Sequence, residues 1–440
     1  MTSAVAEARP AKDVARSGAI RARRLFAGLR EQLRDFAGQL RKHLRVLALF
    51  SAALFAGGLL FAWSGIYSVA ATSGHYPFFR VFLGYALRQS VETHTIGVEA
   101  PPLDDPAMVR RGAAHYQGGC SPCHGAPGQA RNPIARRLLP ESPYLPDRVE
   151  HWSREELFWI VKNGIKYAGM PAWVAPARED EAWSVVAFLL RMPEMDPAAY
   201  RRLAFGEVAD ATTKADEGLR LLLLNGPVGG GIAACARCHG FDGNGGPTGA
   251  FPRLPGQTVE YLYEALKGYS LGTRPSGIMQ PVASELNDEE MRLLAAHYAA
   301  LPAAAPAPPA DGPWAPDPAA LALGRRIAHE GLPRQGVAAC AGCHGPKQGL
   351  RHPLYPSLAG QPASYVAAQL QLWMTGVRGG RYEGQLARVM AHAVGAPPGR
   401  ASENAAVWAM TREQMRAVAL YYASLPPAEP AAAVAEARGD

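Results

Sequence analysis

Beyond its first 45 residues, this chain of 440 residues carries no net formal charge. The opening segment holds eleven Lys or Arg against four Asp or Glu, which accounts for the whole net charge of +7. The remaining residues therefore lack the excess of basic charge that marks nucleic-acid-binding domains. We expect no nucleic-acid partner.

Asp, Glu, Lys and Arg are all missing between positions 46 and 79. The run VLALFSAALFAGGLLFAWSGIY in this region is apolar enough to cross a bilayer core of about 30 Å as a helix. Because the basic segment precedes it, the positive-inside rule predicts a cytoplasmic N-terminus and a main body outside the cytoplasm. A cleaved signal peptide is the alternative, since SVA at Ser68 to Ala70 resembles a processing site, but the leader and the apolar run are longer than a signal peptide's.

Two segments beside the apolar run mix apolar and basic residues. Leu and Phe recur at three- and four-residue steps before it, with Arg between them, which predicts a basic amphipathic helix. This helix either lies on the inner leaflet or simply leads into the span. After the run, FFRVFLGYALRQSV predicts a segment that rests on the outer membrane surface.

All six cysteines of the chain belong to three copies of one motif, CSPCH, CARCH and CAGCH. Cys-x-x-Cys pairs alone would suggest zinc or a redox dithiol, and six exported cysteines would suggest disulfides. A His directly after every pair favours covalent haem instead, because two thiols bond to the haem vinyl groups and the imidazole ligates the iron. We therefore predict three covalently bound haem c groups. The predicted haem-binding cysteines are Cys120, Cys123, Cys235, Cys238, Cys340 and Cys343, and the predicted iron ligands are His124, His239 and His344.

The sequences after the second and third motifs repeat each other. They match at a constant offset of 104 residues, which is too long for a solenoid and indicates duplicated domains. The matched pairs are Pro252 with Pro356, Leu254 with Leu358, Gly256 with Gly360, Gln257 with Gln361, Tyr261 with Tyr365, Leu266 with Leu370, Gly272 with Gly376 and Arg274 with Arg378.

Capping-box pairs indicate where helices begin. The pairs are Ser153 with Glu156, Asn287 with Glu290, and Thr411 with Gln414. We expect each to start the closing helix of one repeat, and these helices read WSVVAFLLRMP, MRLLAAHYAALP and MRAVALYYASLP, each stopped by Pro. Each repeat is then predicted to be mostly α-helical.

With these motifs, the chain resembles the class I cytochrome c family over residues 105–427, and its last two repeats resemble tandem diheme periplasmic members. The resemblance implies an all-α fold of three tandem class I cytochrome c domains after an N-terminal transmembrane helix. The predicted parts are a cytoplasmic basic segment (1–45), the transmembrane helix (46–70), a surface-associated segment (71–100), domain 1 (101–200), domain 2 (211–302), a Pro/Ala linker (303–316), domain 3 (317–427) and a tail (428–440).

The resemblance also implies a Met on the opposite face of each iron, on a loop shortly before the closing helix. Met170 and Met279 match that position in domains 1 and 2. Met390 matches it in domain 3, where His392 and Met410 are alternatives because the following stretch, GAPPGRASENAAVW, is lengthened. The family's acceptor for the other ring nitrogen of each His is a proline carbonyl, and Pro252 and Pro356 match its position. Domain 1 lacks the matching segment, and Pro143 in PYL is its candidate.

Six-coordinate haem leaves no open site for a substrate, so we predict an electron-transfer protein and not an enzyme. It would be a single-pass protein of a bacterial inner membrane with periplasmic haem domains. The expected partners are the membrane and a periplasmic or membrane-bound dehydrogenase, a terminal oxidase, or both, with electrons passing towards quinone or the oxidase. A free-standing shuttle feeding an oxidase, and a haem enzyme that uses domain 3 for peroxide or sulfur chemistry, are the alternatives.

Overall fold

The computed structural model describes residues 11–206, 232–304, 309, 311–345, 351–379, 385–395 and 410–428. The chain divides into two compact units, Met1–Gly74 and His75–Asp440. Parts of the predicted linker and tail, the start of domain 2 and most of the lengthened stretch after Met390 lie outside the described residues.

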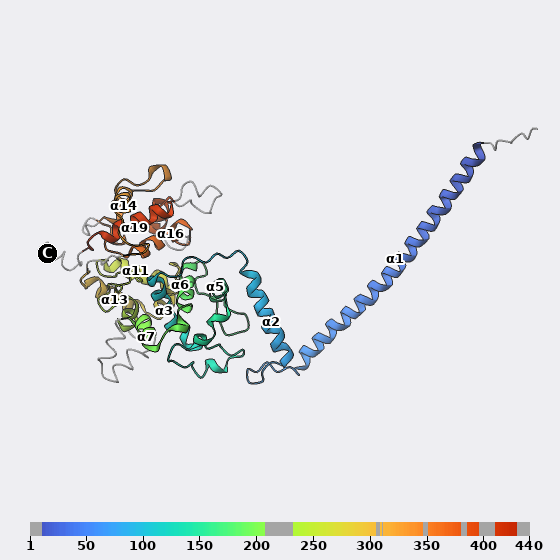
Figure 1. The fold of residues 1–440 in the computed structure, drawn as a ribbon, viewed down its shortest axis with the longest axis horizontal. Helices are drawn as coiled ribbons and strands as arrows, with labels where there is room; N and C mark the ends of the chain where they lie inside the picture. Colours follow the sequence, from blue (N-terminus) through green and yellow to red (C-terminus); the bar gives the residue numbers. More distant parts are fainter. Residues whose placement is uncertain are drawn as a thin grey trace, which may run out of the picture. The chain divides into compact units, whose positions relative to one another are not determined.

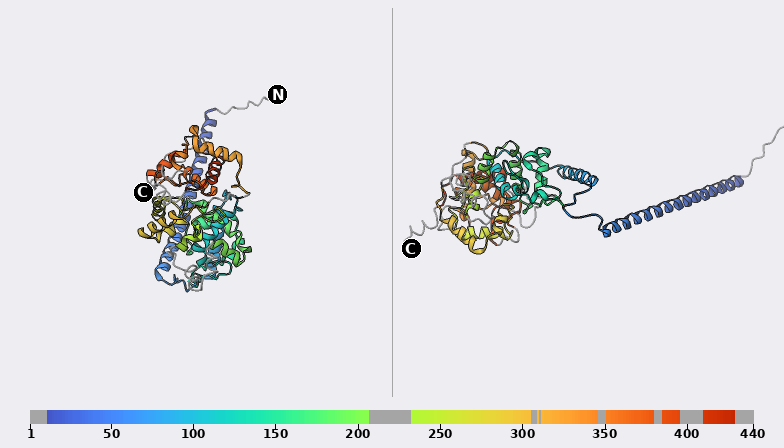
Figure 2. Two further views of the ribbon diagram at one scale, coloured as in Figure 1. Left: turned by 90° about the vertical axis from the view of Figure 1, so that its left-hand side faces the viewer. Right: turned by 90° about the horizontal axis from the view of Figure 1, so that it is seen from below.

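The described part of the first unit is dominated by one long helix, α1 (Ala11–Ser64), which runs without a break in Figure 1 and in the right view of Figure 2. The predicted amphipathic helix and the predicted span are therefore one continuous element, and it ends at Ser64, before the predicted limit of residue 70. Its stretch Gln32–Ser64 is long and apolar enough to cross a membrane, a property that a signal sequence near the N-terminus shares.

The second unit is helical, and its described residues contain no β-strand beyond isolated bridges. This confirms the predicted mostly helical fold. Domain 1, domain 2 and domain 3 are used below as names for the predicted ranges. The first segment of this unit and domain 1 contribute α2 (Pro77–His94), α3 (Pro106–Gly119), α4 (Ser121–His124), α5 (Arg154–Asn163), α6 (Glu179–Leu189) and α7 (Pro197–Phe205). Domain 2 contributes α10 (Ile232–His239), α11 (Val259–Ser270), α12 (Met279–Ser284) and α13 (Asp288–Ala300). Domain 3 contributes α14 (Pro318–Glu330), α15 (Ala341–His344), α16 (Ala363–Met374), α17 (Gln385–Ala393) and α19 (Arg412–Ser424). Short 3₁₀ turns are η1 (Ala135–Arg137), η2 (Leu145–Asp147), η3 (Val149–His151), η4 (Met192–Glu194) and η5 (Pro333–Gln335).

In domains 1 and 3, the helix before the haem motif packs against the closing helix, and a glycine allows the two backbones to meet. A Cβ at Gly112 of α3 would collide with the carbonyl group of Ser184 in α6. A Cβ at Gly324 of α14 would collide with the carbonyl group of Ala417 in α19. The close approach of α14, α19 and α16 is visible in Figure 1. The same crossing therefore supports the haem motif in both domains.

All three predicted capping boxes are present, but one starts a different helix from the one we expected. Asn287 and Thr411 cap the closing helices α13 and α19. Ser153 instead caps α5, whereas the closing helix of domain 1, α6, begins after Arg178 without a side-chain cap. The prediction that Ser153 begins the closing helix was therefore wrong. The capping box reports only a local backbone start, which says nothing about the order of helices in a domain.

The core of domain 1 continues past its predicted limit of residue 200. Tyr200 and Phe205 of α7 are buried in the same apolar cluster as Tyr116 of α3 and Phe188 of α6. The Tyr200 hydroxyl also lies 2.5 Å from Oε1 of Gln117. The segment α7 therefore belongs to the packing of domain 1.

Domains 2 and 3 contact each other through a reciprocal pair of glutamines. The amide of Gln257 donates to the Ser357 carbonyl at 2.9 Å and accepts from the Ser357 N–H at 2.9 Å. The amide of Gln361 donates to the Arg253 carbonyl at 2.8 Å and accepts from the Arg253 N–H at 3.1 Å. Both glutamines are buried, and the two sets of partners are related by the same offset of 104 residues. The repeated Gly-Gln of the sequence therefore forms a symmetric interface between the two domains.

Replacement of either glutamine by Ala should destabilise this interface. Gln257→Ala leaves a buried N–H and a buried C=O of Ser357 without a partner, which costs about 1–3 kcal/mol for each unsatisfied group. Chemical denaturation of the purified protein would measure the loss. The exposed Gln371 of α16 offers a matched control, and an equal effect of Gln371→Ala would contradict the assignment.

Candidate haem sites

Each Cys-x-x-Cys-His motif forms one helical turn. In α4 the N–H groups of Cys123 and His124 donate to the Cys120 carbonyl at 3.1 and 2.9 Å. Beside α15, the N–H groups of Cys343 and His344 donate to the Cys340 carbonyl at 3.2 and 2.8 Å. The second motif forms the end of α10. Because residues three and four apart lie on the same side of a helix, each turn presents two thiols and one imidazole together.

The three motif histidines have the same hydrogen-bond partner. Nδ1 of His124 lies 3.0 Å from the Pro143 carbonyl oxygen, and Nδ1 of His239 lies 3.0 Å from that of Pro252. The third distance, from Nδ1 of His344 to the carbonyl oxygen of Pro356, is 2.9 Å. These contacts confirm the predicted proline acceptors.

The proline contacts determine which ring nitrogen can bind iron. A carbonyl oxygen only accepts, so Nδ1 carries the hydrogen and the lone pair remains on Nε2. Burial lowers the pKa of His124, His239 and His344, which keeps the rings neutral. A neutral imidazole with a fixed ring orientation is the form that ligates a metal.

The first cysteine of each motif packs against an apolar cluster. Burial raises the pKa of the Cys120 thiol to about 12 and those of Cys235 and Cys340 to about 11. None of the six cysteines is in a disulfide. These three thiols are held protonated in apolar surroundings, which lowers their reactivity in thiol–disulfide exchange. Their position beside apolar side chains suits a covalent bond to an apolar macrocycle.

The sites also hold cationic groups that suit the carboxylates of haem. Nε of Arg253 and Nη2 of Arg351 are buried and have no hydrogen-bond partner within the described residues. Guanidinium donors pair favourably with carboxylates, and haem carries two propionate groups. Together with the thiols and the oriented imidazoles, these donors show that the residues present fit haem c.

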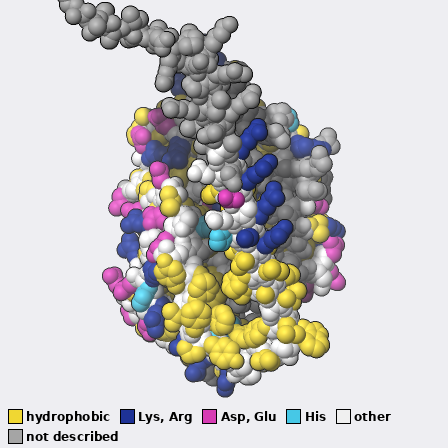
Figure 3. Space-filling view, turned by 90° about the vertical axis from the view of Figure 1, so that its right-hand side faces the viewer, with side chains coloured by type: hydrophobic (Ala, Val, Ile, Leu, Met, Phe, Trp, Pro, Cys, Tyr) yellow, Lys and Arg dark blue, Asp and Glu magenta, His cyan; other side chains and the backbone are white. Residues whose placement is uncertain are grey.

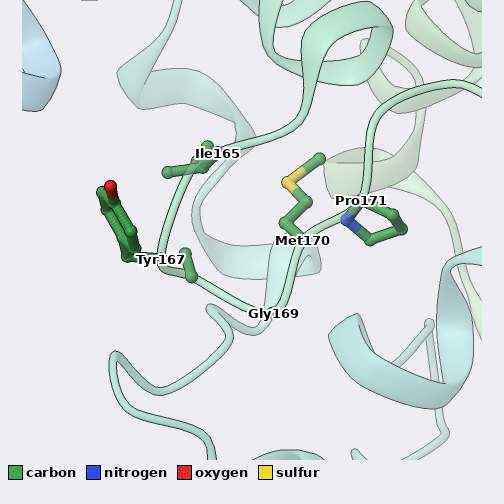
Figure 4. A pocket seen from close by; sticks show the side chains of 6 residues that line it. Ile165, Tyr167, Gly169, Met170 and Pro171 are labelled. Carbon is green, nitrogen blue, oxygen red and sulfur yellow. The ribbon is translucent and has the colours of Figure 1, made fainter.

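The predicted methionine ligand of domain 1 lies on a tight loop between α5 and α6. The Ile165 N–H donates to the Met170 carbonyl at 3.1 Å, and Trp173 continues the loop with an N–H bond to the Lys162 carbonyl. Figure 4 shows Ile165 and Met170 on facing arms of this loop, with Tyr167 projecting away from them. Met170 itself is half-buried.

The predicted methionine ligands of domains 2 and 3 are also half-buried and precede the closing helices. Met279 begins α12, and its N–H donates to Oγ of Ser276 at 3.0 Å. Met390 lies in α17 and packs against the core cluster of domain 3. The nearby His392 is exposed, and its Nδ1 contacts the Arg388 carbonyl of the same helix at 2.7 Å. Met410 is buried in the core cluster.

Sequence reasoning missed the residues that join domain 1 to domain 2. The buried Glu181 of α6 bonds to Ser276 and Gly277 of domain 2, and Arg178 donates to the Pro275 carbonyl at 2.9 Å. Arg111 of α3 donates to the Ala250 carbonyl at 3.3 Å. A single Glu or Arg in a helix carries no spacing signal, so no sequence pattern could have identified these contacts.

The comparisons with known proteins agree with this site. Residues 107–189 match the family model described as cytochrome c oxidase, cbb3-type, subunit III. A thiosulfate dehydrogenase electron acceptor from Thiomonas intermedia is 37% identical over 34% of this chain and 66% of its own length. Another from Stutzerimonas stutzeri is 39% identical over 33% of this chain and 65% of its own length. The chain thus spans slightly less than two thirds of either electron acceptor.

A cytochrome c4 from Pseudomonas aeruginosa is 33% identical over 33% of this chain and 69% of its own length. Helical domains with oriented Cys-x-x-Cys-His turns are typical of c-type cytochromes. With this relative, the chain belongs to the c-type cytochrome family.

A mutational test distinguishes the candidate iron ligands of domain 3, Met390, His392 and Met410. If Met390 binds the iron, Met390→Leu should remove about one third of the methionine-to-iron charge-transfer absorbance of the oxidised protein. His392→Ala and Met410→Leu are the matched variants and should leave that absorbance unchanged. Unchanged absorbance in Met390→Leu, or loss of the absorbance in Met410→Leu, would contradict the assignment.

Proposed function

We propose that this chain is a membrane-anchored triheme cytochrome that carries electrons outside the cytoplasm. Haem c at the three motifs would supply reversible one-electron redox chemistry. The observation that carries the proposal is the threefold recurrence of a neutral motif His whose Nδ1 donates to a proline carbonyl. The cysteines that would hold the three groups are Cys120, Cys123, Cys235, Cys238, Cys340 and Cys343. The residues that would bind the irons are His124 with Met170, His239 with Met279, and His344 with Met390.

A dehydrogenase is the proposed electron donor. The relatives from Thiomonas intermedia and Stutzerimonas stutzeri are named as electron acceptors of thiosulfate dehydrogenase, which supports a donor of this class. The chain's own residues bind and orient the three groups, and no described residue is needed as a general acid or base for this task. We therefore assign the chain the role of an electron carrier and not that of an enzyme.

The proposed acceptor is quinone or a terminal oxidase. Domain 1 supports the oxidase, because residues 107–189 match a family model described as an oxidase subunit. Anchoring by α1 would confine the carrier to the membrane that holds such an enzyme and would raise its effective concentration there.

Reduction by a dehydrogenase tests this function directly. Purified full-length protein mixed with thiosulfate and catalytic thiosulfate dehydrogenase should show reduction of three haem equivalents in its visible spectrum. Intact mass should show the same three covalent additions. A Cys340→Ala, Cys343→Ala double variant should retain two, because each domain has its own motif. Fewer than three additions in the parent protein would contradict the triheme assignment, and the absence of reduction would contradict the donor.

We further propose that α2 rests on the membrane outside the cytoplasm. Its first half exposes large apolar side chains, with Phe78 at 74% and Phe82 at 55% exposure. Its second half is held by domain 1, where the Arg88 guanidinium lies 4.8 Å from the Trp152 ring centroid and Val91 is fully buried. The short segment 65–76 joins α2 to the end of the proposed span, so a lipid surface is the expected occupant of this apolar face.

The electrostatics of α1 agree with a span that begins in the cytoplasm. Figure 3 shows Lys and Arg side chains in a line, separate from a field of apolar side chains. In the described part of α1, exposed Arg34, Arg41 and Arg45 precede the apolar stretch that starts at Val46. Basic residues at the cytoplasmic end of a span favour this orientation.

Hydrogen exchange tests the lipid contact of α2. In the full-length protein reconstituted into phospholipid nanodiscs, the amides of the first half of α2 should exchange more slowly than in a Phe78→Glu, Phe82→Glu variant. Burying two phenylalanines in the interface contributes about 1.5–3 kcal/mol each, so a slowing of about tenfold or more is expected. Leu271→Glu, at an exposed site of domain 2, is the control. Equal exchange in all three proteins would rule out the contact.

A further inference from the structure

The buried Glu181 of domain 1 contacts the segment that carries the proposed methionine ligand of domain 2. Its side chain is 3% exposed. Oε1 accepts from the Ser276 hydroxyl at 2.6 Å, and Oε2 accepts from the Gly277 N–H at 2.6 Å. These two residues precede Met279 by three and two positions, so the carboxylate lies beside the loop and not beside the thioether itself.

Ser276 passes this restraint on to Met279. Its Oγ donates to Glu181 and in turn accepts the N–H groups of Ile278 and Met279, at 3.3 and 3.0 Å. A hydroxyl that donates to a carboxylate polarises and becomes a better acceptor, so the chain of hydrogen bonds is cooperative. The backbone that begins α12 is thus tied to a carboxylate in another domain.

The carboxylate is itself fixed in orientation. Nη1 of Arg178 lies 3.0 Å from Oε1 of Glu181 and donates to the Pro275 carbonyl at 2.9 Å. The indole N–H of Trp173 donates to Oε2 of Glu181 at 3.3 Å. A buried carboxylate with this many donors has little freedom to rotate, and hydrogen bonds to a charged acceptor are the stronger kind.

Trp173 links the same carboxylate to the methionine loop of domain 1. It lies three residues after Met170, and its ring lies against Gly277, where a Cβ would collide with the indole nitrogen. The ring of His115 also contacts the Trp173 ring, and the two ring centroids are 4.7 Å apart. The loops of both proposed methionine ligands therefore meet at one buried carboxylate.

We propose that Glu181 is a positioning residue through which domain 1 holds the Met279 loop of domain 2 in its ligating conformation. The inference rests on the proposed function, because it takes Met279 as an iron ligand. It makes the second site dependent on the first domain: without the carboxylate, the Ser276 hydroxyl and the Gly277 N–H are left buried and unpaired, and the loop gains freedom to move. Met279 should then leave the iron more readily. The Met170 loop loses only the Trp173 indole bond and keeps its own backbone bonds, from Ile165 to Met170 and from Trp173 to Lys162, so the first and third sites should change little.

Binding of imidazole to the oxidised full-length protein tests this proposal, because added imidazole replaces methionine only after the methionine has dissociated. In Glu181→Ala, one of the three haem equivalents should bind imidazole about ten- to a hundredfold faster than in the parent protein, as the loss of charge-assisted hydrogen bonds implies. Glu181→Gln should have an intermediate effect. Glu179→Gln, at an exposed position of the same helix, is the matched control and should behave as the parent protein.

Two further variants keep the result decisive. Ser276→Ala leaves Glu181 and Arg178 in place and removes only the hydroxyl link, so it should also accelerate one equivalent if Glu181→Ala is too unstable to purify. Met279→Leu identifies the affected site, because the fast equivalent must be the one that loses its charge-transfer absorbance in that variant. Unchanged kinetics in both Glu181→Ala and Ser276→Ala, or an equal acceleration of all three equivalents, would overturn the positioning role. If Met279→Leu leaves the parent spectrum unchanged, the ligand assignment fails instead.

Discussion

The structure depends on one hydrogen bond that occurs three times, from Nδ1 of a motif His to a proline carbonyl. The carbonyl accepts the N–H of the imidazole, which fixes the ring and leaves Nε2 with its lone pair. The segment that follows each motif must therefore place its proline, Pro143, Pro252 or Pro356, at the same position relative to the motif His. The helices around the motifs pack closely, and in domains 1 and 3 Gly112 and Gly324 allow the helix before the motif to contact the closing helix.

The two contacts between domains are chemically different. Domains 2 and 3 meet through paired amides of Gln257 and Gln361, which are neutral and symmetric because the two domains are repeats. Domain 1 meets domain 2 through the buried pair of Arg178 and Glu181, each of which also bonds to the backbone of domain 2. Buried ion pairs contribute little net stability but strongly disfavour misplaced partners, so this contact is better suited to fixing a geometry.

Local sequence signals predicted a large share of the site. The motif turns, the proline acceptors and the three capping boxes follow from residues a few positions apart, or from a family pattern that repeats them. The order of helices was less predictable: Ser153 begins α5 and not the closing helix, because a cap has no information about what its helix later packs against. Likewise, Tyr200 and Phe205 join the domain 1 core through α3 and α6, which no local pattern around them indicates.

By itself, the sequence determined which thiols and imidazoles form each haem motif, where three capped helices begin, and which stretch is apolar enough to span a bilayer. These properties depend on residues close together in the chain. Only the tertiary structure decided that Glu181 meets Ser276 and Gly277, residues more than ninety positions later. That meeting depends on how two folded domains pack, because a lone carboxylate finds its partners through the shape of the interface and not through spacing along the chain.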